Sequence, residues 1–316
     1  MRHSALALTL LFATPLVAQT KAFPALQAVP EPYDQVALTR DGKAAARLHF
    51  GAGLRRPFVY PILGPSGAGL TRMGHPHDPV GHSHHNSVWI SHNDVNGVSF
   101  WADRGKNAGR IVTQRLEKLE DGAEAAATLL NHWIGPDDKV LLVERRRTAL
   151  HPLDKGESLL LLDLTLEAKG GPVTLGKTPF GLVGVRMAKT IGIADGGGAI
   201  RNSEGQVNEK GEKGCFWKPA RWVDYSGPSG PKTVEGITLF DHPANPNHPS
   251  VFHVREDGWM GTSLTFAAAR ELIPGAPLRL RYGLYVHAGA PPLDAINGVW
   301  QAFAKAPLAE LTPKKK

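Results

Sequence analysis

Cysteine is nearly absent from this sequence, with Cys215 the only one among 316 residues. The chain therefore cannot form an intrachain disulfide, which excludes the small secreted domains that are held together by disulfide bridges. Burial as a small apolar side chain is the simplest interpretation of Cys215. Hydrophobic residues make up 42% of the chain, which is ample for a core that needs no covalent cross-link.

Long apolar runs are absent beyond the first twenty residues, which read MRHSALALTLLFATPLVAQT. Arg2 precedes an apolar stretch that runs from Ala5 to Val17 and ends in small residues. This pattern predicts a cleaved export signal over residues 1–18. We therefore expect a mature chain, residues 19–316, that has no membrane span. An exported chain without disulfides is typical of the bacterial periplasm or exterior, so the predicted location is periplasmic or secreted.

The sequence also lacks clusters in which basic and aromatic residues alternate. Its formal net charge is +7, and part of that charge comes from residues 145–147 and from the lysines at 314–316. A nucleic-acid groove combines positive charge with aromatic rings on which the bases stack. We therefore expect no nucleic-acid partner, although the positive charge would suit acidic glycans.

Helical periodicity is scarce, whereas alternation of apolar and polar residues recurs along the chain. One helix is predicted over residues 294–303, with Asp294 as its N-cap, and residues 196–213 are predicted to be a long loop. Residues 267–272 fit a short helical turn or a strand. The clearest predicted strands are residues 35–40, 43–50, 111–120, 123–133, 140–150, 158–167 and 278–287. Many strands and few short helices predict one all-β domain over residues 19–316, a large antiparallel β-sandwich of the supersandwich type, with an up-and-down barrel as the alternative.

Histidine is concentrated in residues 73–101, which read MGHPHDPVGHSHHNSVWISHNDVNGVSFW. This segment contains six of the fourteen histidines: His75, His77, His82, His84, His85 and His92. The pattern predicts a structured loop, a strand over residues 87–91, a turn over residues 93–97 and a second strand over residues 98–101. Short loops that are dense in histidine usually serve ligands, although any single histidine could simply cap backbone groups.

Two kinds of chemistry fit these histidines. His82 and His84 share one face of an extended chain, so they could bind a divalent metal such as Zn²⁺ or Cu²⁺ with a third ligand from elsewhere. Alternatively, the histidines could act as general acids or bases near neutral pH.

The same segment carries a family signature. It consists of His82-Ser83-His84-His85-Asn86-Ser87-Val88-Trp89 followed by His92-Asn93-Asp94-Val95-Asn96-Gly97-Val98-Ser99-Phe100-Trp101. In these residues, and over residues 35–289 more generally, the chain resembles the bacterial PmoA-like family, whose members carry the label methane oxygenase PmoA and whose function is largely unknown. The family often has Asp where this chain has Gly81, and Arg where it has Asn86. The resemblance implies a β-sandwich similar to that of galactose-mutarotase-like proteins.

Further polar and aromatic residues in strand-like segments are candidates for the same site. The predicted catalytic residues are His84, His85, His92, His242 and His287. The predicted substrate-binding residues are Arg186, Trp222, Asp224, Tyr225, Arg281 and Tyr285. Trp222 could instead belong to the core, and Arg281, Tyr285 and His287 share a strand face that would be either the floor of a cleft or a solvent-exposed surface.

Histidines with aromatic and carboxylate neighbours favour a carbohydrate or another small molecule as the ligand. We therefore expect an exported carbohydrate-active enzyme, a hydrolase, lyase or epimerase, that uses histidine acid/base catalysis. The alternatives are a metal enzyme, oxidative or not, with His82, His84 and another histidine as ligands, and a non-catalytic glycan-binding module. The acid/base hypothesis requires no cofactor, and the metal hypothesis requires a divalent metal.

Overall fold

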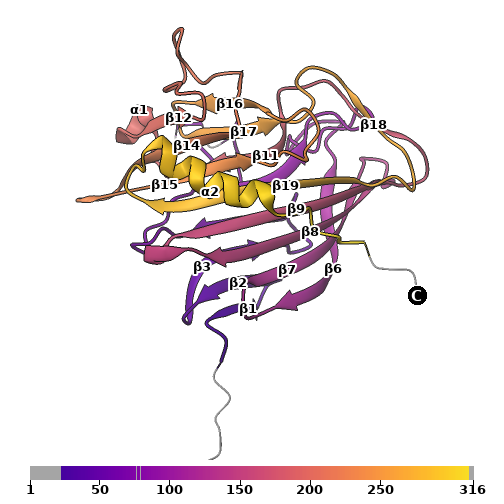
Figure 1. Ribbon diagram of the computed structural model, residues 1–316. Coiled ribbons are helices and arrows are strands. Elements are labelled where there is room, and N and C mark those ends of the chain that lie inside the picture. The colour runs from indigo at the N-terminus through magenta and orange to yellow at the C-terminus, as the bar shows by residue number, and fades with distance from the viewer. Residues whose placement is uncertain (1–22, 76, 79, 313–316) are drawn as a thin grey trace, which may run out of the picture.

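The computed structural model describes residues 23–75, 77–78 and 80–312. Two large antiparallel sheets, of nine and eight strands, form a sandwich (Figure 1). The predicted antiparallel β-sandwich is therefore confirmed, and the barrel alternative is wrong because the strands form two separate sheets. The predicted export signal, residues 1–18, lies outside the described residues. Among the described residues, no helix is long and apolar enough to cross a membrane.

The nine-stranded sheet has the order β1-β2-β3-β4-β5-β11-β17-β16-β13. Its strands are β1 Leu26–Glu31, β2 Gln35–Arg40, β3 Lys43–His49, β4 Phe58–Ile62, β5 Val88–His92, β11 Gly181–Arg186, β13 Lys218–Pro219, β16 Val251–Arg255 and β17 Trp259–Ser263. The hairpin β2–β3 turns at Asp41 and Gly42, which both have positive φ angles (51° and 74°), as a tight two-residue turn requires.

The eight-stranded sheet has the order β12-β14-β15-β19-β9-β8-β7-β6. Its strands are β6 Arg110–Glu120, β7 Ala125–Ile134, β8 Val140–Pro152, β9 Ser158–Ala168, β12 Ala199–Asn202, β14 Trp222–Gly230, β15 Thr233–Asp241 and β19 Leu278–Ala288. A separate two-stranded sheet pairs β10 Val173–Leu175 with β18 Arg270–Leu272. The meander predicted over residues 111–150 is confirmed as β6, β7 and β8.

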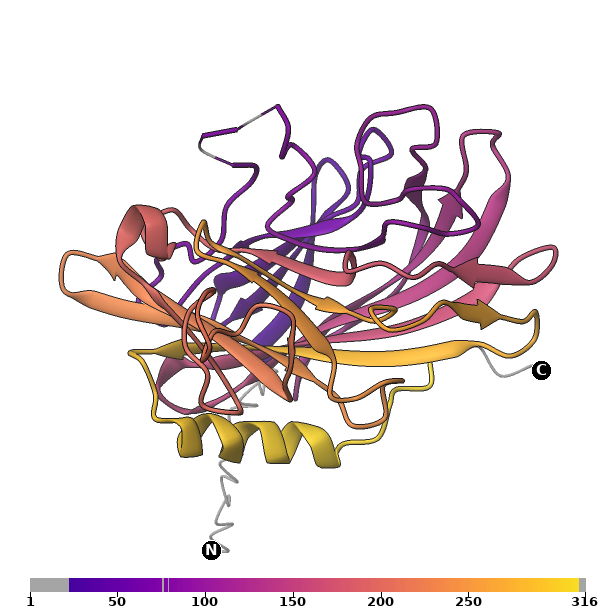
Figure 2. The same ribbon diagram turned by 90° about the horizontal axis from the view of Figure 1, so that it is seen from above.

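The two large sheets bury one continuous apolar core between them. On β19 every second residue faces this core, including Leu280, Tyr282 and Leu284. The helix α2 Leu293–Lys305 covers the other face of the eight-stranded sheet, where Ile296 and Phe303 are buried. Figure 2 shows α2 on one side of the sandwich and the histidine-rich segment on the opposite side.

Several local predictions need correction. The helix α2 begins after Pro292, whose side chain makes no capping hydrogen bond, so Asp294 lies in its first turn and is not the N-cap. Residues 98–101 form no strand, because they make only isolated bridges, from Val98 to Val95 and from Ser99 to Ala108. The segment 196–213 is only partly a loop, since it contains the end of the short helix α1 Ile193–Gly196 and the strand β12.

Candidate functional site

A group of large side chains stands on the outer face of the nine-stranded sheet, where β5, β11, β17 and β16 are neighbours. Alternate residues of these strands point into the core, so the residues between them point outward. Trp89 on β5, Arg186 on β11, Trp259 on β17 and His253 on β16 occupy these outward positions and are nevertheless buried. Their burial shows that loops cover this part of the sheet.

Glycines on two of the strands allow the tryptophan rings to lie flat on the sheet. A Cβ atom added at Gly184 would lie 2.5 Å from Cζ2 of Trp89, and one at Gly261 would lie 3.0 Å from Cζ2 of Trp259. Any larger residue at Gly184 would push the Trp89 ring off the neighbouring strand. The sequence thus makes room for the aromatic floor with glycine, which lies across the strand pair from Trp89 at Gly184 and two residues along the same strand from Trp259 at Gly261.

The loop over residues 73–87 brings the histidines onto this floor, and three imidazole–carboxylate contacts fix it. His75 Nε2 lies 3.0 Å from Asp257 Oδ2, and His77 Nε2 lies 2.8 Å from Asp195 Oδ1. The loop also closes on itself, because His82 Nδ1 lies 2.7 Å from an Asp78 oxygen. The loop is therefore held by a contact within itself, by the turn between β16 and β17, which contains Asp257, and by the short helix α1, which contains Asp195.

The result is a hollow of about 510 Å³, which we call the His–Trp pocket. It is lined by His82, His84, His85, Asn93, Trp101, Phe180, His253, Arg255, Asp257 and Trp259. Of the predicted catalytic residues, His84 and His85 are in this pocket, and the predicted metal ligand His82 joins them. A pocket of this size is in the range of sites that bind small molecules.

The imidazoles contact one another and the aromatic floor. The ring centroids of His84 and His85 are 4.4 Å apart, and those of His82 and His85 are 5.0 Å apart. His85 stacks on Trp89 at 5.2 Å. On the far side of the pocket, His253 packs edge-on against Trp259 at 4.2 Å.

Burial keeps His84, His85 and His253 neutral. It lowers the pKa of His84 and of His253 from 6.5 to about 4, and it lowers the pKa of His85 still further, with His84 and Arg186 adding repulsion. At neutral pH each of the three rings therefore carries one N–H donor and one acceptor nitrogen. His85 Nδ1 and both ring nitrogens of His253 are buried and have no hydrogen-bond partner among the described residues.

His82 is arranged differently, because a carboxylate orients it. The Gly81 backbone N–H and His82 both hydrogen-bond to Asp78 and hold the pKa of this carboxyl below its ordinary value, so Asp78 is charged at neutral pH. His82 therefore donates its Nδ1–H to Asp78, which leaves Nε2 as an acceptor in the neutral ring. The His82 side chain is 39% exposed and lines the pocket.

Arg186 anchors the base of the pocket. Its Nη1 donates to Asp257 Oδ1 at 2.8 Å, and the side chain is fully buried. Burial raises the pKa of Asp257, but Arg186 and His75 outweigh this effect and hold it below its ordinary value. The charged Asp257 carboxylate thus bridges Arg186 on β11 and His75 on the loop.

The predicted metal site lacks a third ligand in the part of the chain that the structure describes. There, no group of three or more His, Cys, Asp or Glu side chains is arranged to hold a metal ion. The rings of His82 and His84 are 5.8 Å apart, and Asp78 already binds His82 Nδ1. The metal hypothesis therefore gains no ligand set from this geometry.

A second histidine–carboxylate group, which we call the Asp224 cluster, lies on the outer face of the other sheet. Asp224 Oδ1 accepts hydrogen bonds from His287 Nε2 (2.8 Å) and Thr238 Oγ1 (3.0 Å). Asp224 Oδ2 accepts from Arg201 Nη2 (2.6 Å) and Ser226 Oγ (3.1 Å). The predicted convergence of Asp224 and His287 with His84 and His85 is wrong, because the core separates the two faces.

Two predicted substrate-binding aromatics are buried in the structure. Trp222 is fully buried, packs beneath α2 and donates its Nε1–H to Asn297 Oδ1 at 2.9 Å. Tyr225 is also fully buried and faces the core, and its hydroxyl binds backbone groups of Ile193 and Glu256. Neither ring can therefore stack on a ligand, and for Trp222 the alternative interpretation as a core residue holds.

The remaining predicted site residues tie parts of the fold together. His92 is fully buried, accepts from the Asp94 N–H and faces Thr265 Oγ1 at 2.8 Å. His242 Nε2 lies 2.9 Å from the carbonyl oxygen of Ala306 at the end of α2.

On β19, the face that bears Arg281 and Tyr285 is neither a cleft floor nor solvent-exposed, because both side chains are buried. Arg281 Nε donates to Asp163 at 2.6 Å, and the Tyr285 hydroxyl donates to Glu157 at 2.6 Å. This side of the strand therefore serves the fold.

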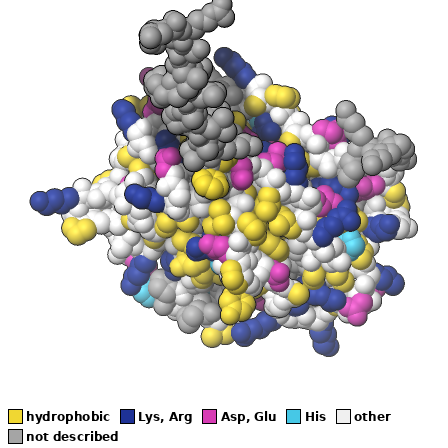
Figure 3. Space-filling model, turned by 90° about the horizontal axis from the view of Figure 1, so that it is seen from below, with side chains coloured by type: hydrophobic (Ala, Val, Ile, Leu, Met, Phe, Trp, Pro, Cys, Tyr) yellow, Lys and Arg dark blue, Asp and Glu magenta, His cyan; other side chains and the backbone are white. Residues whose placement is uncertain are grey.

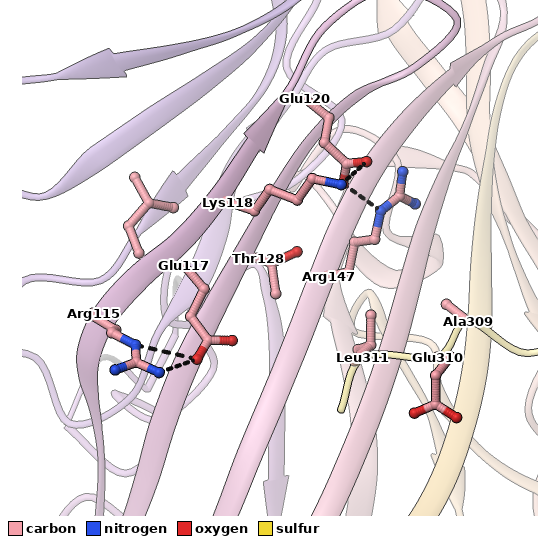
Figure 4. Close-up of a pocket in the computed structure, with 10 residues that line it drawn as sticks. Arg115, Glu117, Lys118, Glu120, Thr128, Arg147, Ala309, Glu310 and Leu311 are labelled. Carbon is pink, nitrogen blue, oxygen red and sulfur yellow. Dashed lines mark hydrogen bonds and ion pairs between the residues drawn. The ribbon is translucent and has the colours of Figure 1, made fainter. Parts of the chain in front are cut away.

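A larger hollow, of about 730 Å³, lies over β6, β7 and β8 beside residues 309–311. Figure 4 shows its charged side chains turned toward one another: Arg115 pairs with Glu117, and Glu120 pairs with Lys118 and Arg147. These ions satisfy each other, so the hollow offers no free polar group of this set to a ligand. Figure 3 shows a face on which hydrophobic side chains gather among scattered charges and histidine forms only small patches.

Of the ten residues that line the His–Trp pocket, only His82, His84 and His85 are among the site residues that the sequence predicts. His253, Arg255, Asp257 and Trp259 come from the hairpin β16–β17, more than 150 residues after the histidine-rich loop. A signal for them is present, since His253 and Arg255 are two residues apart and so share one face of a strand. What the sequence could not supply is the pairing of β11 with both β5 and β17, which places that hairpin beside the loop.

Fold and site together define an all-β sandwich with a histidine- and tryptophan-lined pocket on the outer face of one sheet. The chain belongs to a family of unknown function, DUF6807, whose model matches residues 35–301. No curated protein matches the chain.

Proposed function

We propose that this protein is an exported, carbohydrate-active enzyme that binds a sugar or glycoside in the His–Trp pocket and transfers protons through histidine. One observation carries the proposal: neutral imidazoles and the aromatic rings of Trp101, Phe180 and Trp259 line the same pocket. A sugar offers hydroxyl groups, which need both donors and acceptors, and apolar C–H faces, which pack on aromatic rings.

The aromatic part of the pocket is contiguous. The ring of Trp101 lies 5.9 Å from that of Trp259 and 5.5 Å from that of Phe180. These rings adjoin the imidazoles, because His84 lies 6.1 Å from Trp101 and His85 lies 6.1 Å from Trp259. A sugar ring in the hollow would place its apolar face on the aromatics and its hydroxyls toward the histidines.

His82 is the best candidate for proton transfer. Its Nδ1–H is held by the charged Asp78 at 2.7 Å, so its Nε2 is free to take a proton from the ligand. A carboxylate that fixes the tautomer and supports the imidazolium after proton transfer is a recurring catalytic arrangement. A general base positioned in this way contributes about 10²–10⁴-fold to the rate.

The carboxylates favour proton abstraction from carbon over hydrolysis. Most glycoside hydrolases need two carboxyl groups on either side of the bond that breaks. Among the described residues that line the pocket, Asp257 is the only acid, and Arg186 and His75 already bind it. A lyase or epimerase, in which an imidazole removes a proton next to a carbonyl, fits this set better than a hydrolase does.

The protein would be periplasmic or secreted, and it would be related to the PmoA-like family. The export signal predicted over residues 1–18 supports a periplasmic or secreted protein with a small-molecule ligand and no nucleic-acid partner. The PmoA-like resemblance covers nearly the same residues as the family match and supports placing the two groups together.

Turnover assays on a panel of sugars test the proposal. The panel contains nitrophenyl glycosides for hydrolysis, uronates for elimination, and aldoses and ketoses incubated in D₂O for proton exchange observed by NMR. We expect exchange or elimination with at least one member, and a decrease of about 10²–10⁴-fold in His82→Ala. His151→Ala is the matched control, because His151 is 46% exposed and lies outside the pocket.

Other outcomes separate the alternatives. Binding measured by calorimetry without turnover would identify a glycan-binding module. Activity that disappears on chelation and returns with a metal found by elemental analysis would support the metal enzyme. Unchanged turnover in His82→Ala would sink the proposed proton transfer.

A further inference from the structure

A second hollow lies next to the His–Trp pocket, and we call it the Trp217 hollow. It has a volume of about 430 Å³ and is lined by Lys177, Thr178, Pro179, Trp217, Phe266 and Ala267. The rings of Trp217 and Phe266 are 5.8 Å apart and meet at 58°, so they form two walls of an open V. No residue of this hollow belongs to the His–Trp pocket.

Trp217 is held in a conformation that a bulky residue rarely adopts. Its φ angle is +54°, in the left-handed region, and its side chain is among the exposed large hydrophobic groups, at 45%. The backbone is fixed there because Trp217 N–H donates to the Phe252 carbonyl at 2.9 Å and Lys218 N–H donates to the Cys215 carbonyl at 3.2 Å. Strain of this kind tends to persist at ligand sites, and here it exposes a large aromatic ring.

His253 connects the two hollows. Its ring lies 4.2 Å from Trp259 and 5.3 Å from Phe180 in the His–Trp pocket. It also lies 6.1 Å from Trp217. Phe180, at the edge of the His–Trp pocket, directly follows Pro179 in the Trp217 hollow. A ligand that leaves the first pocket past His253 and Phe180 therefore meets the face of Trp217.

We propose that the Trp217 hollow is a second subsite, which binds the adjoining ring of the same ligand. This inference rests on the proposed function and narrows its substrate class to glycosides of at least two rings. The adjoining ring would stack on the face of Trp217 that Phe216 does not cover, beside Phe266, and the exposed Lys177 at the rim would donate to its hydroxyls.

Calorimetry with matched one-ring and two-ring ligands tests the second subsite. The probes are methyl glucoside with cellobiose and maltose, methyl galactoside with β-1,4-galactobiose, and methyl xyloside with xylobiose. We expect at least one two-ring member to bind about two- to tenfold more tightly than its one-ring partner. In Trp217→Ala this gain should disappear, while the one-ring affinity stays unchanged and Trp217→Phe keeps most of the gain.

Tyr33→Ala is the matched control, because Tyr33 is also an exposed aromatic (89%) with a positive φ angle (63°), and it lies outside both hollows. It should change neither affinity. Equal affinities for one-ring and two-ring ligands, or equal weakening of both by Trp217→Ala, would overturn the second subsite and leave the His–Trp pocket as the sugar site. If no member of the panel binds to the wild-type protein, the proposed function and this inference both fail.

Discussion

The His–Trp pocket and the Asp224 cluster contain the same types of residue and lie on opposite outer faces of the sandwich. In the pocket, Asp78 holds one nitrogen of His82, and the rest of the ring faces a hollow. In the cluster, Asp224 holds His287, but both side chains are fully buried. Four hydrogen bonds saturate the Asp224 carboxylate. Both places contain a buried ring nitrogen without a partner among the described residues, His287 Nδ1 in the cluster and His85 Nδ1 in the pocket, so the difference lies in accessibility: the His82 side chain is 39% exposed, whereas that of His287 is fully buried.

The difference teaches that a histidine–carboxylate pair indicates a site only when part of it remains unpartnered and accessible. Asp224 joins β14 to β15, β19 and β12 through Thr238, His287 and Arg201, so its hydrogen bonds serve to stabilise the fold. In the part of the chain that the structure describes, the side-chain hydrogen bonds of Asp78 stay within its own loop, so its removal should affect the orientation of His82 more than the fold. The following experiments test this division, from the largest expected effect to the smallest.

Asp224→Ala should destabilise the protein by about 3–5 kcal/mol, because it leaves the charged Arg201 and a buried His287 without their partner. The free energy of unfolding from urea titration measures the effect. Asp224→Asn, which keeps the volume and part of the hydrogen bonding, should cost less than Asp224→Ala. A loss below about 1 kcal/mol in Asp224→Ala would show that the cluster is not a structural element.

Histidines of the nine-stranded sheet and the Asp224 cluster should also make the stability of the protein depend on pH in different ranges. Burial lowers the pKa of His92 and of His253, both on the nine-stranded sheet, from 6.5 to about 4. Between these values the unfolded chain binds protons that the folded chain does not, so stability should fall as the pH drops from about 6.5 to 4, by roughly 3 kcal/mol for each histidine.

The contribution of Asp224 to stability changes in a lower pH range. Burial raises the pKa of its carboxyl, but His287 and Arg201 outweigh burial and hold the pKa below its ordinary value. Its contribution is therefore complete above the unfolded pKa of about 4 and is lost as the pH falls below that value. The free energy of unfolding, measured by urea titration between pH 7 and 3, tests this difference. Above pH 4 it should fall less in His92→Gln than in the wild-type protein, and it should fall in Asp224→Asn as much as in the wild-type protein. A stability that stays flat between pH 6.5 and 4 would contradict the assignment.

Gly184→Ala should cost about 1–3 kcal/mol, because the new methyl group would press on the Trp89 ring 2.5 Å away. Since His85 stacks on Trp89, ligand affinity in the His–Trp pocket should fall as well. Gly298→Ala is the control, because a Cβ atom there meets nothing within 4 Å and Gly298 lies inside α2, so this change should stabilise by about 0.5–1 kcal/mol. Urea titration of both variants decides whether packing on Trp89 matters.

The sequence predicts the strands well and the sites only in part, for a physical reason. Alternation fixes which face of a strand is apolar, and β2, β9 and β19 end within one residue of their predicted bounds. Alternation does not reveal what covers the other face. The polar side of β19 was compatible with a cleft, but α2 and the Asp224 cluster bury it.

The pairing of strands that are distant in the sequence explains why the other pocket residues are not predicted. His84 and His85 were recognised from local density, and they do line a pocket. Their neighbours His253 and Trp259 were missed because only the strand order β5-β11-β17-β16 brings them there. The same order sends β14 and β19 to the other sheet, which separates Asp224 and His287 from the pocket.

Asp78→Asn gives the smallest expected change in stability and the sharpest test of the comparison. The Asp78 and His82 side chains are 46% and 39% exposed, and pairs this exposed to water contribute little to stability, so the free energy of unfolding should change little. Turnover on any active sugar should nevertheless fall by about tenfold or more, because an amide can no longer support the imidazolium or fix the tautomer with Nδ1 protonated. The KM should stay nearly constant, since Asp78 is not among the residues that line the pocket. Urea titration and steady-state kinetics on the same preparation separate the two effects: a large loss of stability would make Asp78 a counterpart of Asp224, and unchanged turnover would remove its role in orienting His82.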